Sequence, residues 1–369
     1  MESLNTRFRT LCHHLDGWVE RDLFLTDCPP DAFETISPQI KLIWKKECQP
    51  RLRSLGLVYD SLHHTLYLST IRCIVGQKLC CCVASTLISK LNSLQFTCKT
   101  PSGRDPGYSC PLNFFGWNSD PRWPRCRYKF GESYVSDTGM IGYQHIVDWT
   151  GFNAMLDMGN LLFDFGYTNN YDNLMTRVKI LIGDKRLKEP ATIFLLLVDE
   201  SPTFQMPEPV VNERSRFNPE YFRFEDMLEA SDSSKLLRNI EHVGHCWFGE
   251  LTSCFLDVYR YYRESDSIAL LRRVDCLQCM RAPDGMNTVE VIDLHISDIM
   301  RPEHREQLQS GSDEASIPFH LDGRDLIRYS NCGIKAAART RLQSYDRLMT
   351  HIVNDRRLAH ELSVSNLED

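Results

Sequence analysis

The sequence predicts an α+β protein with a helical N-terminal part, an antiparallel β-sandwich or jelly roll, and a C-terminal helix. Apolar residues recur at helical spacing near the N-terminus, short runs rich in Val, Ile, Phe and Tyr fill the middle, and an amphipathic helical pattern ends the chain. A stretch dense in Pro, Gly, Trp and Cys separates the first two parts. The expected boundaries are a helical segment at 1–100, a loop-rich junction at 101–136, a β-sandwich domain at 137–334 and a helix at 335–369.

The N-terminal segment is expected to be mostly helical. Leu4, Phe8 and Leu11 recur at a spacing of three or four residues, which places their side chains on one face of a helix. The stretch from 61 to 94 contains few residues that break helices, and its apolar residues continue the same pattern.

The middle segment is expected to supply the strands of the sandwich. Its apolar runs are short and lie between turn signals, and their β-branched and aromatic residues favour strands over helices. The expected strands are 160–167, 175–182, 191–198, 240–248, 268–274, 289–296 and 317–321. Few helix-length patterns lie between them, which disfavours βα units and a parallel sheet. The final helix is expected from Lys335 to about Leu362, with Leu342 and Ile352 on its apolar face.

Length and composition indicate a folded, soluble chain. It has 369 residues, of which 42% are hydrophobic and 25% charged. These values are close to the averages for globular proteins and provide enough apolar surface to offset the entropy lost on folding. The formal net charge of -7 gives no overall attraction to nucleic acid or to an anionic membrane. Binding to either would therefore have to come from a local patch.

Cysteine usage and the N-terminus point to a reducing compartment. The chain has 15 cysteines, an odd number without the framework of a small secreted domain, and its first residues lack a secretory signal pattern. We therefore expect free thiols and a cytoplasmic or nuclear protein that is not secreted. The longest apolar runs, such as 193–198, are far shorter than the roughly 20 residues that cross a bilayer, so no membrane span is expected.

A structural zinc site is the cofactor that the sequence makes possible, although our expectation is that there is none. Cys276 and Cys279 have the two-residue spacing that lets two thiolates bind one tetrahedral ion. His242 and His245, or the adjacent Cys246, could supply the other ligands. The alternative is that these cysteines are buried thiols in a hydrophobic core.

No catalytic residue is predicted. The chain contains neither a G-x-S-x-G elbow nor a glycine-rich phosphate loop. Asp199 and Glu200 end the most apolar run, where carboxylates could bind a metal or act as acid and base. The commoner explanation is that charge ends a buried strand where it reaches water. A non-enzymatic protein is favoured, and an enzyme whose site is assembled from distant residues stays open.

Two clusters of cations predict contact with single-stranded nucleic acid. In the first, cations for phosphates interleave with rings for base stacking, and the second lies on the C-terminal helix. The candidate residues are Arg122, Trp123, Arg125, Arg127, Tyr128 and Lys129, followed by Lys335, Arg339 and Arg341. Arg125, Arg127 and Lys129 would share one face if this segment is a strand. The alternative is an exposed strand and a solvated helix face of mixed charge.

The segment from about Arg177 to Gly249 resembles two families of viral proteins. It runs TRVKILIGDKRL, ATIFLLLVDESPTF, a Pro-rich loop, RFEDMLEAS and LLRNIEHVGHCWFG. This succession is similar to the central part of jelly-roll capsid proteins of small circular single-stranded-DNA viruses, including geminiviruses. The apolar run that ends in Asp199 also resembles plant-virus movement proteins.

These resemblances imply a structural or movement-type viral protein that self-associates and contacts nucleic acid. The expected partners are therefore further copies of the same chain and single-stranded nucleic acid. Two alternatives stay open, namely a regulatory module that binds other proteins and the enzyme considered above.

Overall fold

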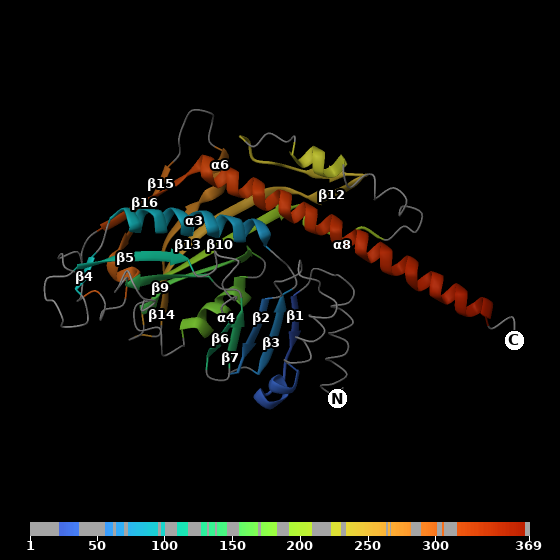
Figure 1. Cartoon of the computed structure of the whole chain (residues 1–369), viewed down its shortest axis with the longest axis horizontal. Coiled ribbons are helices and arrows are strands. Elements are labelled where there is room, and N and C mark those ends of the chain that lie inside the picture. Colours follow the sequence, from blue (N-terminus) through green and yellow to red (C-terminus); the bar gives the residue numbers. More distant parts are fainter. Residues whose placement is uncertain are drawn as a thin grey trace.

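The computed structural model arranges the chain as two larger sheets, two hairpins and a layer of helices (Figure 1). The predicted α+β class is therefore confirmed, whereas a sandwich or jelly roll is not. The structure describes residues 22–36, 56–61, 64–69, 73–94, 97–99, 109–116, 127–130, 133–136, 139–145, 155–168, 171–182, 192–208, 223–229, 234–262, 265, 267–281, 289–300, 305 and 316–365.

The larger sheet forms the centre of the fold. Its seven strands are β4 (Thr97–Lys99), β5 (Ser109–Gly116), β8 (Gly139–His145), β9 (Met155–Tyr167), β10 (Thr192–Ser201), β13 (Glu250–Tyr262) and β14 (Ser267–Asp275). Their order across the sheet is β14-β13-β10-β9-β8-β5-β4. Neighbours pair antiparallel except β9 and β10, which are parallel. Helix α4 (Tyr171–Ile182) connects these two strands, so β9, α4 and β10 form a βαβ unit.

The expectation of a wholly antiparallel arrangement was wrong because the stretch 175–182 forms α4 and not a strand. Leu174 and Val178 lie one helical turn apart, and both side chains are buried. A Cβ atom added to Gly166 of β9 would lie 2.6 Å from Leu174 Cδ1, so α4 packs closely on this face of the sheet. The helical period in this segment was therefore mistaken for a short apolar strand.

The smaller sheet replaces much of the expected N-terminal helix. Its strands are β1 (Asp22–Leu25), β2 (Gly56–Asp60), β3 (Thr65–Ser69), β6 (Arg127–Phe130) and β7 (Ser133–Ser136), in the order β1-β3-β2-β7-β6. Tyr59 and Leu66 pair across β2 and β3, and both are fully buried. Burial of this sheet face overrides the helical spacing inferred for the segment. Leu4, Phe8 and Leu11, which motivated that inference, lie outside the described residues.

The predicted loop-rich junction at 101–136 contributes strands to both sheets. It contains β5 of the larger sheet and the β6–β7 hairpin of the smaller one. The segment therefore connects the two sheets through ordinary strand pairing as well as loops.

Two helices cover one face of the larger sheet. They are α3 (Ile74–Ser93) and α8 (Gly323–Ser365), which lie over the larger sheet in Figure 1, where the C-terminal end of α8 extends away from the rest of the protein. A Cβ atom added to Gly333 of α8 would lie 2.7 Å from Val75 Cα, so the two backbones touch at this point. The predicted C-terminal helix is confirmed, and it begins earlier than expected, at Gly323.

The core lies between this helical layer and the sheet. Phe194, Leu196 and Val198 of β10 point into it, together with buried residues of α3, α8 and the hairpin β15 (Val289–His295) and β16 (Ser316–Asp322). The intervening residues Ile193 and Leu195 are equally buried on the opposite face. Cover on both faces explains why β10 is a continuous apolar run without alternation.

The remaining strand predictions have three outcomes. The run 240–248 is a hairpin of β11 (Ile240–His242) and β12 (His245–Phe248), because Val243 and Gly244 both adopt positive φ between them. Strand β13 was not predicted at all, although its residues 250–260 pair with the whole of β10. The strands expected at 160–167, 191–198, 268–274, 289–296 and 317–321 are confirmed.

Helix α3 is long and apolar enough to cross a membrane by length and composition alone. Half of its apolar stretch is buried, and it packs against α8, β16, β9 and β10. The core helix of a globular protein passes the same test, so α3 is weak evidence for a membrane span.

Candidate functional site

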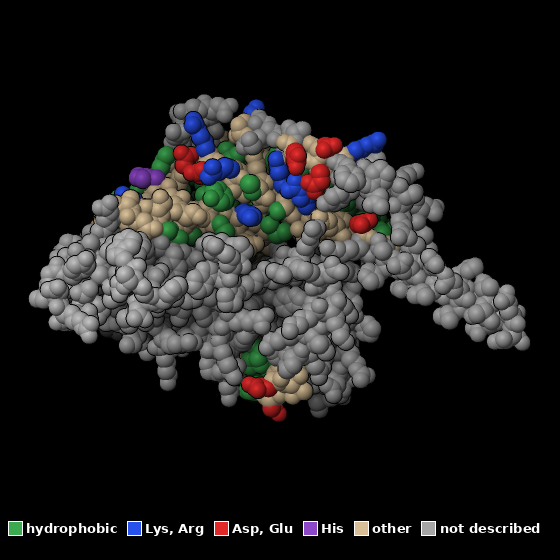
Figure 2. Space-filling model, viewed as in Figure 1, with side chains coloured by type: hydrophobic (Ala, Val, Ile, Leu, Met, Phe, Trp, Pro, Cys, Tyr) green, Lys and Arg blue, Asp and Glu red, His purple; other side chains and the backbone are tan. Residues whose placement is uncertain are grey.

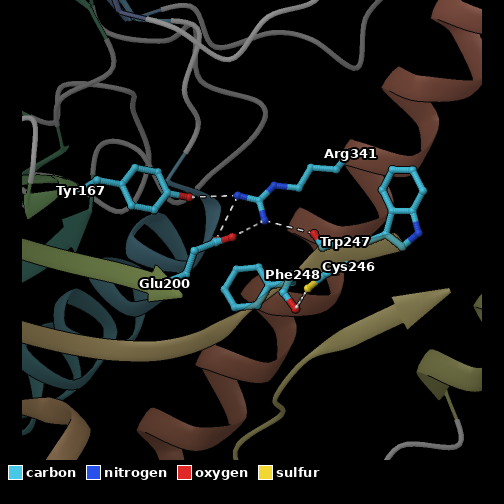
Figure 3. A network of polar contacts seen from close by, with 6 residues as sticks. All are labelled: Tyr167, Glu200, Cys246, Trp247, Phe248 and Arg341. Carbon is cyan, nitrogen blue, oxygen red and sulfur yellow. Dashed lines mark hydrogen bonds and ion pairs between the residues drawn. The ribbon is translucent and has the colours of Figure 1, made fainter. Parts of the chain in front are cut away.

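The carboxyl end of β10 carries a fully buried ion pair between Glu200 and Arg341 of α8 (Figure 3). Arg341 Nη1 and Nη2 donate to Glu200 Oε1 and Oε2 at 2.8 and 3.0 Å. Arg341 Nη1 also donates to the Trp247 carbonyl oxygen at 3.1 Å, and Nη2 to the Tyr167 hydroxyl at 3.4 Å. The Phe204 ring lies 4.4 Å from the guanidinium carbon.

The ion pair between Glu200 and Arg341 holds α8 against the carboxyl end of β10. The exposed fractions of the two side chains are 4% for Arg341 and 2% for Glu200, so the carboxylate and guanidinium neutralise each other away from water. Arg341 was predicted to bind nucleic acid. In the structure its guanidinium is buried and both of its terminal nitrogens bind Glu200, so this side chain does not lie on the surface.

A second network lies on the opposite face of the sheet. Asp257 of β13 is fully buried and accepts two hydrogen bonds of 2.7 Å from Nε and Nη2 of Arg273 in β14. The Tyr259 hydroxyl donates to Asp257 at 3.0 Å and lies 3.0 Å from the Tyr171 hydroxyl of α4. Burial, followed by the Tyr171 and Asp257 contacts, raises the pKa of Tyr259 above its ordinary value. The network therefore joins β13, β14 and α4 through a neutral phenol and an ion pair.

A third buried carboxylate is used in the same way. Asp298, in the 3-10 turn Ile296–Asp298 that follows β15, is paired with Arg260 of β13. Its second oxygen accepts a hydrogen bond of 2.8 Å from the His295 backbone nitrogen. Glu200, Asp257 and Asp298 thus each join two secondary-structure elements through an arginine.

The residues of the predicted zinc site are not brought together. Cys276 and Cys279 lie on the short helix α6 (Cys276–Arg281), whereas His242 and His245 pair with each other in the β11–β12 hairpin. Within the described residues no group of three His, Cys, Asp or Glu side chains could hold a metal ion. Both cysteines are buried in the core, and burial raises the pKa of Cys279 to about 11. This arrangement agrees with the alternative of buried thiols.

The residues predicted to contact nucleic acid are separated. Arg122, Trp123 and Arg125 lie outside the described residues. Arg127, Tyr128 and Lys129 belong to β6, which forms an edge of the smaller sheet, and the strand periodicity places Arg127 and Lys129 on one face.

The two remaining candidates on α8 are partly buried. Lys335 is half-buried, and Arg339 Nε donates to Glu225 Oε2 at 2.6 Å. Figure 2 shows basic and acidic side chains lying next to one another over the described part of the face in view. The described part of this face therefore carries mixed charge.

Sequence reasoning missed the edge of the larger sheet. Strand β14 was predicted as a strand but not as an edge, and its Leu270 and Leu271 have exposed fractions of 48% and 46%. The register with β13 pairs Val258 with Arg272 and Tyr259 with Leu270, so Leu271 is skipped as a β-bulge. The available signal in the sequence was two consecutive leucines followed by two arginines, because a strand with one buried face would alternate apolar and polar residues.

Comparison with known proteins gives no relative for this chain. No family model matches it, and neither a curated protein nor a solved structure is significantly similar.

Proposed function

We propose that this chain is a non-enzymatic structural protein that self-associates. The observation that carries the proposal is β14, a nine-residue strand at the edge of the central sheet with exposed Leu270 and Leu271. A long edge strand with apolar side chains is a template for pairing with another chain, which natural proteins usually block. An exposed edge of this kind favours association over catalysis as the use of this surface.

The buried charges support the same proposal. Glu200, Asp257 and Asp298 each pair with an arginine from another secondary-structure element. Carboxylates held in this way fix the positions of α8, β14 and β15, and none of these pairings leaves a carboxylate poised for proton transfer. They suit a rigid building block, which is also what the resemblance to viral capsid and movement proteins implies.

Buried thiols support an intracellular reducing location. Cys73, Cys80 and Cys254 are buried in one core cluster and carry free thiols. Buried protonated thiols behave as small apolar groups and fit a cytoplasmic or nuclear protein.

Light scattering coupled to size-exclusion chromatography tests self-association. The chain has a mass of 42.8 kDa. We expect the measured mass to exceed this value and to rise with protein concentration. A mass that stays at the monomer value from low to high micromolar concentration would overturn the proposal and favour a regulatory module or an enzyme.

Nucleic-acid contact is a second candidate function, and β6 favours it. Arg127 and Lys129 are alternate residues of a strand at a sheet edge, and cations at alternate positions of a strand suit a phosphate backbone. Replacing Arg125, Arg127 and Lys129 by Ala should flatten the salt dependence of single-strand affinity by about 0.7 in log–log slope per lost phosphate contact. Arg328→Ala, on the exposed face of α8, is the matched control. An unchanged slope in the triple variant would remove β6 from consideration.

A further inference from the structure

We infer that two copies of this chain pair through their β14 strands, antiparallel, about a two-fold axis close to Leu271. The inference rests on the proposed self-association and specifies its surface and symmetry. A two-fold contact uses the same surface on both partners, so the surface has to be complementary to itself. Strand β14 meets this requirement in its backbone, its charges and its side chains.

The backbone of β14 is open to a second strand. It pairs with β13 on one side, and none of the described residues pairs with its other side. Its nine residues contain no proline, so none lacks a backbone N–H group, and the N–H groups that do not bond to β13 point to the other side. The opposite edge of the sheet, β4, has three residues. A contact between two β14 strands therefore forms a longer ladder than a contact between β14 and β4.

The charges of β14 do not oppose a second copy. Arg272 Nη2 lies 3.0 Å from Glu290 Oε2, and Arg273 is held by Asp257. Exposed charges on an edge strand normally prevent pairing by repulsion. Here both arginines are neutralised within their own chain, which removes that obstacle.

The side chains match in the register that a two-fold axis at Leu271 imposes. Leu271 then faces Leu271 of the second copy, Ile268 faces Val274, and Ser267 faces Asp275. The aliphatic stems of Arg272 and Arg273 face Leu270 and Ala269, so no two like charges stand directly opposite. Leu271 is the residue that the β13 register skips, so a contact centred there displaces no existing pair.

Substituting Leu271 by Lys tests the inference. Two lysines would meet at the axis, and we expect the dissociation constant of the dimer to rise at least tenfold by light scattering. Leu94→Lys, at a comparably exposed leucine that caps the C-terminal end of α3, is the control and should leave the constant unchanged. Circular dichroism should show that both variants fold.

A cross-link tests the axis independently of affinity. Leu271→Cys should form a disulfide-linked dimer under mild oxidation on a non-reducing gel, whereas Leu94→Cys should form far less. An oligomer that Leu271→Lys does not weaken and that Leu271→Cys does not cross-link would overturn this inference while leaving self-association in place. A wild-type chain that is monomeric at every concentration would overturn both.

Discussion

Two arginine–carboxylate pairs on opposite faces of the central sheet have similar geometry and different surroundings. Both Arg341 with Glu200 and Arg273 with Asp257 make two short hydrogen bonds, between 2.7 and 3.0 Å. In the first pair both side chains are buried. In the second, Asp257 is fully buried but the Arg273 side chain is 50% exposed and lies over the Phe255 ring. The first pair holds α8 to β10 in the protein interior, and the second links β13 to the edge strand β14.

The difference shows that the cost of losing a partner depends on whether water can replace it. Removing Arg341 would leave Glu200 charged in the core beneath α8. The Arg273 side chain is itself half-exposed and bonds both oxygens of Asp257, so its removal would leave the carboxylate close to solvent. The same pair of residue types therefore contributes unequal amounts to stability.

The largest effect is expected from Arg341→Ala. Breaking a buried ion pair by removing one partner typically costs about 3 to 5 kcal/mol, because the remaining charge stays buried and unpaired. We expect the free energy of unfolding, measured with urea, to fall by that order. The loss should also be visible as weaker protection of α8 backbone amides from hydrogen exchange, since Arg341 fixes this helix to β10.

A double variant separates the ion pair from simple packing. Glu200→Gln combined with Arg341→Met removes both charges and should recover most of the stability lost in Arg341→Ala. Arg328→Ala breaks an exposed pair with Asp325 on the same helix and should change the free energy of unfolding by about 1 kcal/mol or less. A loss in Arg341→Ala no larger than that of Arg328→Ala would contradict the interior role of the pair.

A smaller effect is expected from Arg273→Ala. It removes two charge-assisted hydrogen bonds to Asp257, and water that enters the site partly replaces them. We expect a net loss of about 1.5 to 3 kcal/mol in the free energy of unfolding. Its neighbour Arg272, whose pair with Glu290 is exposed on both sides, provides the control. Urea unfolding should rank the losses as Arg341→Ala, then Arg273→Ala, then Arg272→Ala. If Arg273→Ala equals or exceeds Arg341→Ala, the contrast between the two faces is wrong.

The sequence could predict the elements whose pattern is local, but not those that depend on distant neighbours. Patterns within one segment were sufficient for the C-terminal helix and for strands such as β10 and β15, because their periodicity or apolar content is local. Strand β13 was missed because it is buried unevenly on both faces and carries Asp257 and Arg260 within it. Its assignment depends on the neighbours that satisfy those charges, and the sequence does not order the strands.

The polar networks could not be predicted for a related reason. Glu200 and Arg341 are separated by 141 positions, and Arg341 looked like one of several cations on an amphipathic helix. The packing of α8 on α3, with the close approach at Gly333, and on β12 brings that side chain to the end of β10. The sequence indicates that β10 ends in acidic residues, but it predicts that Arg341, the partner of Glu200, binds nucleic acid.

The smallest expected effect concerns the pH dependence of stability through Cys73, which begins α3. Its sulfur accepts a hydrogen bond of 3.3 Å from the Gly76 backbone nitrogen, and burial raises the pKa of Cys73 to about 12 despite that bond. In the unfolded chain the thiol loses its proton near pH 8.5, whereas the folded protein keeps it, so stability is full below that pH and falls as pH rises further.

Cys73→Ser isolates this contribution, because serine can keep the hydrogen bond to Gly76 and does not ionise in this range. Between about pH 8 and 9.5, the wild type should lose about 1 kcal/mol more of its free energy of unfolding than Cys73→Ser. Cys332→Ser, at an exposed position on α8, should retain the wild-type slope. Parallel curves for the wild type and Cys73→Ser would mean that the thiol ionises equally in the folded and unfolded states. Cys73 would then be accessible to water in the folded protein.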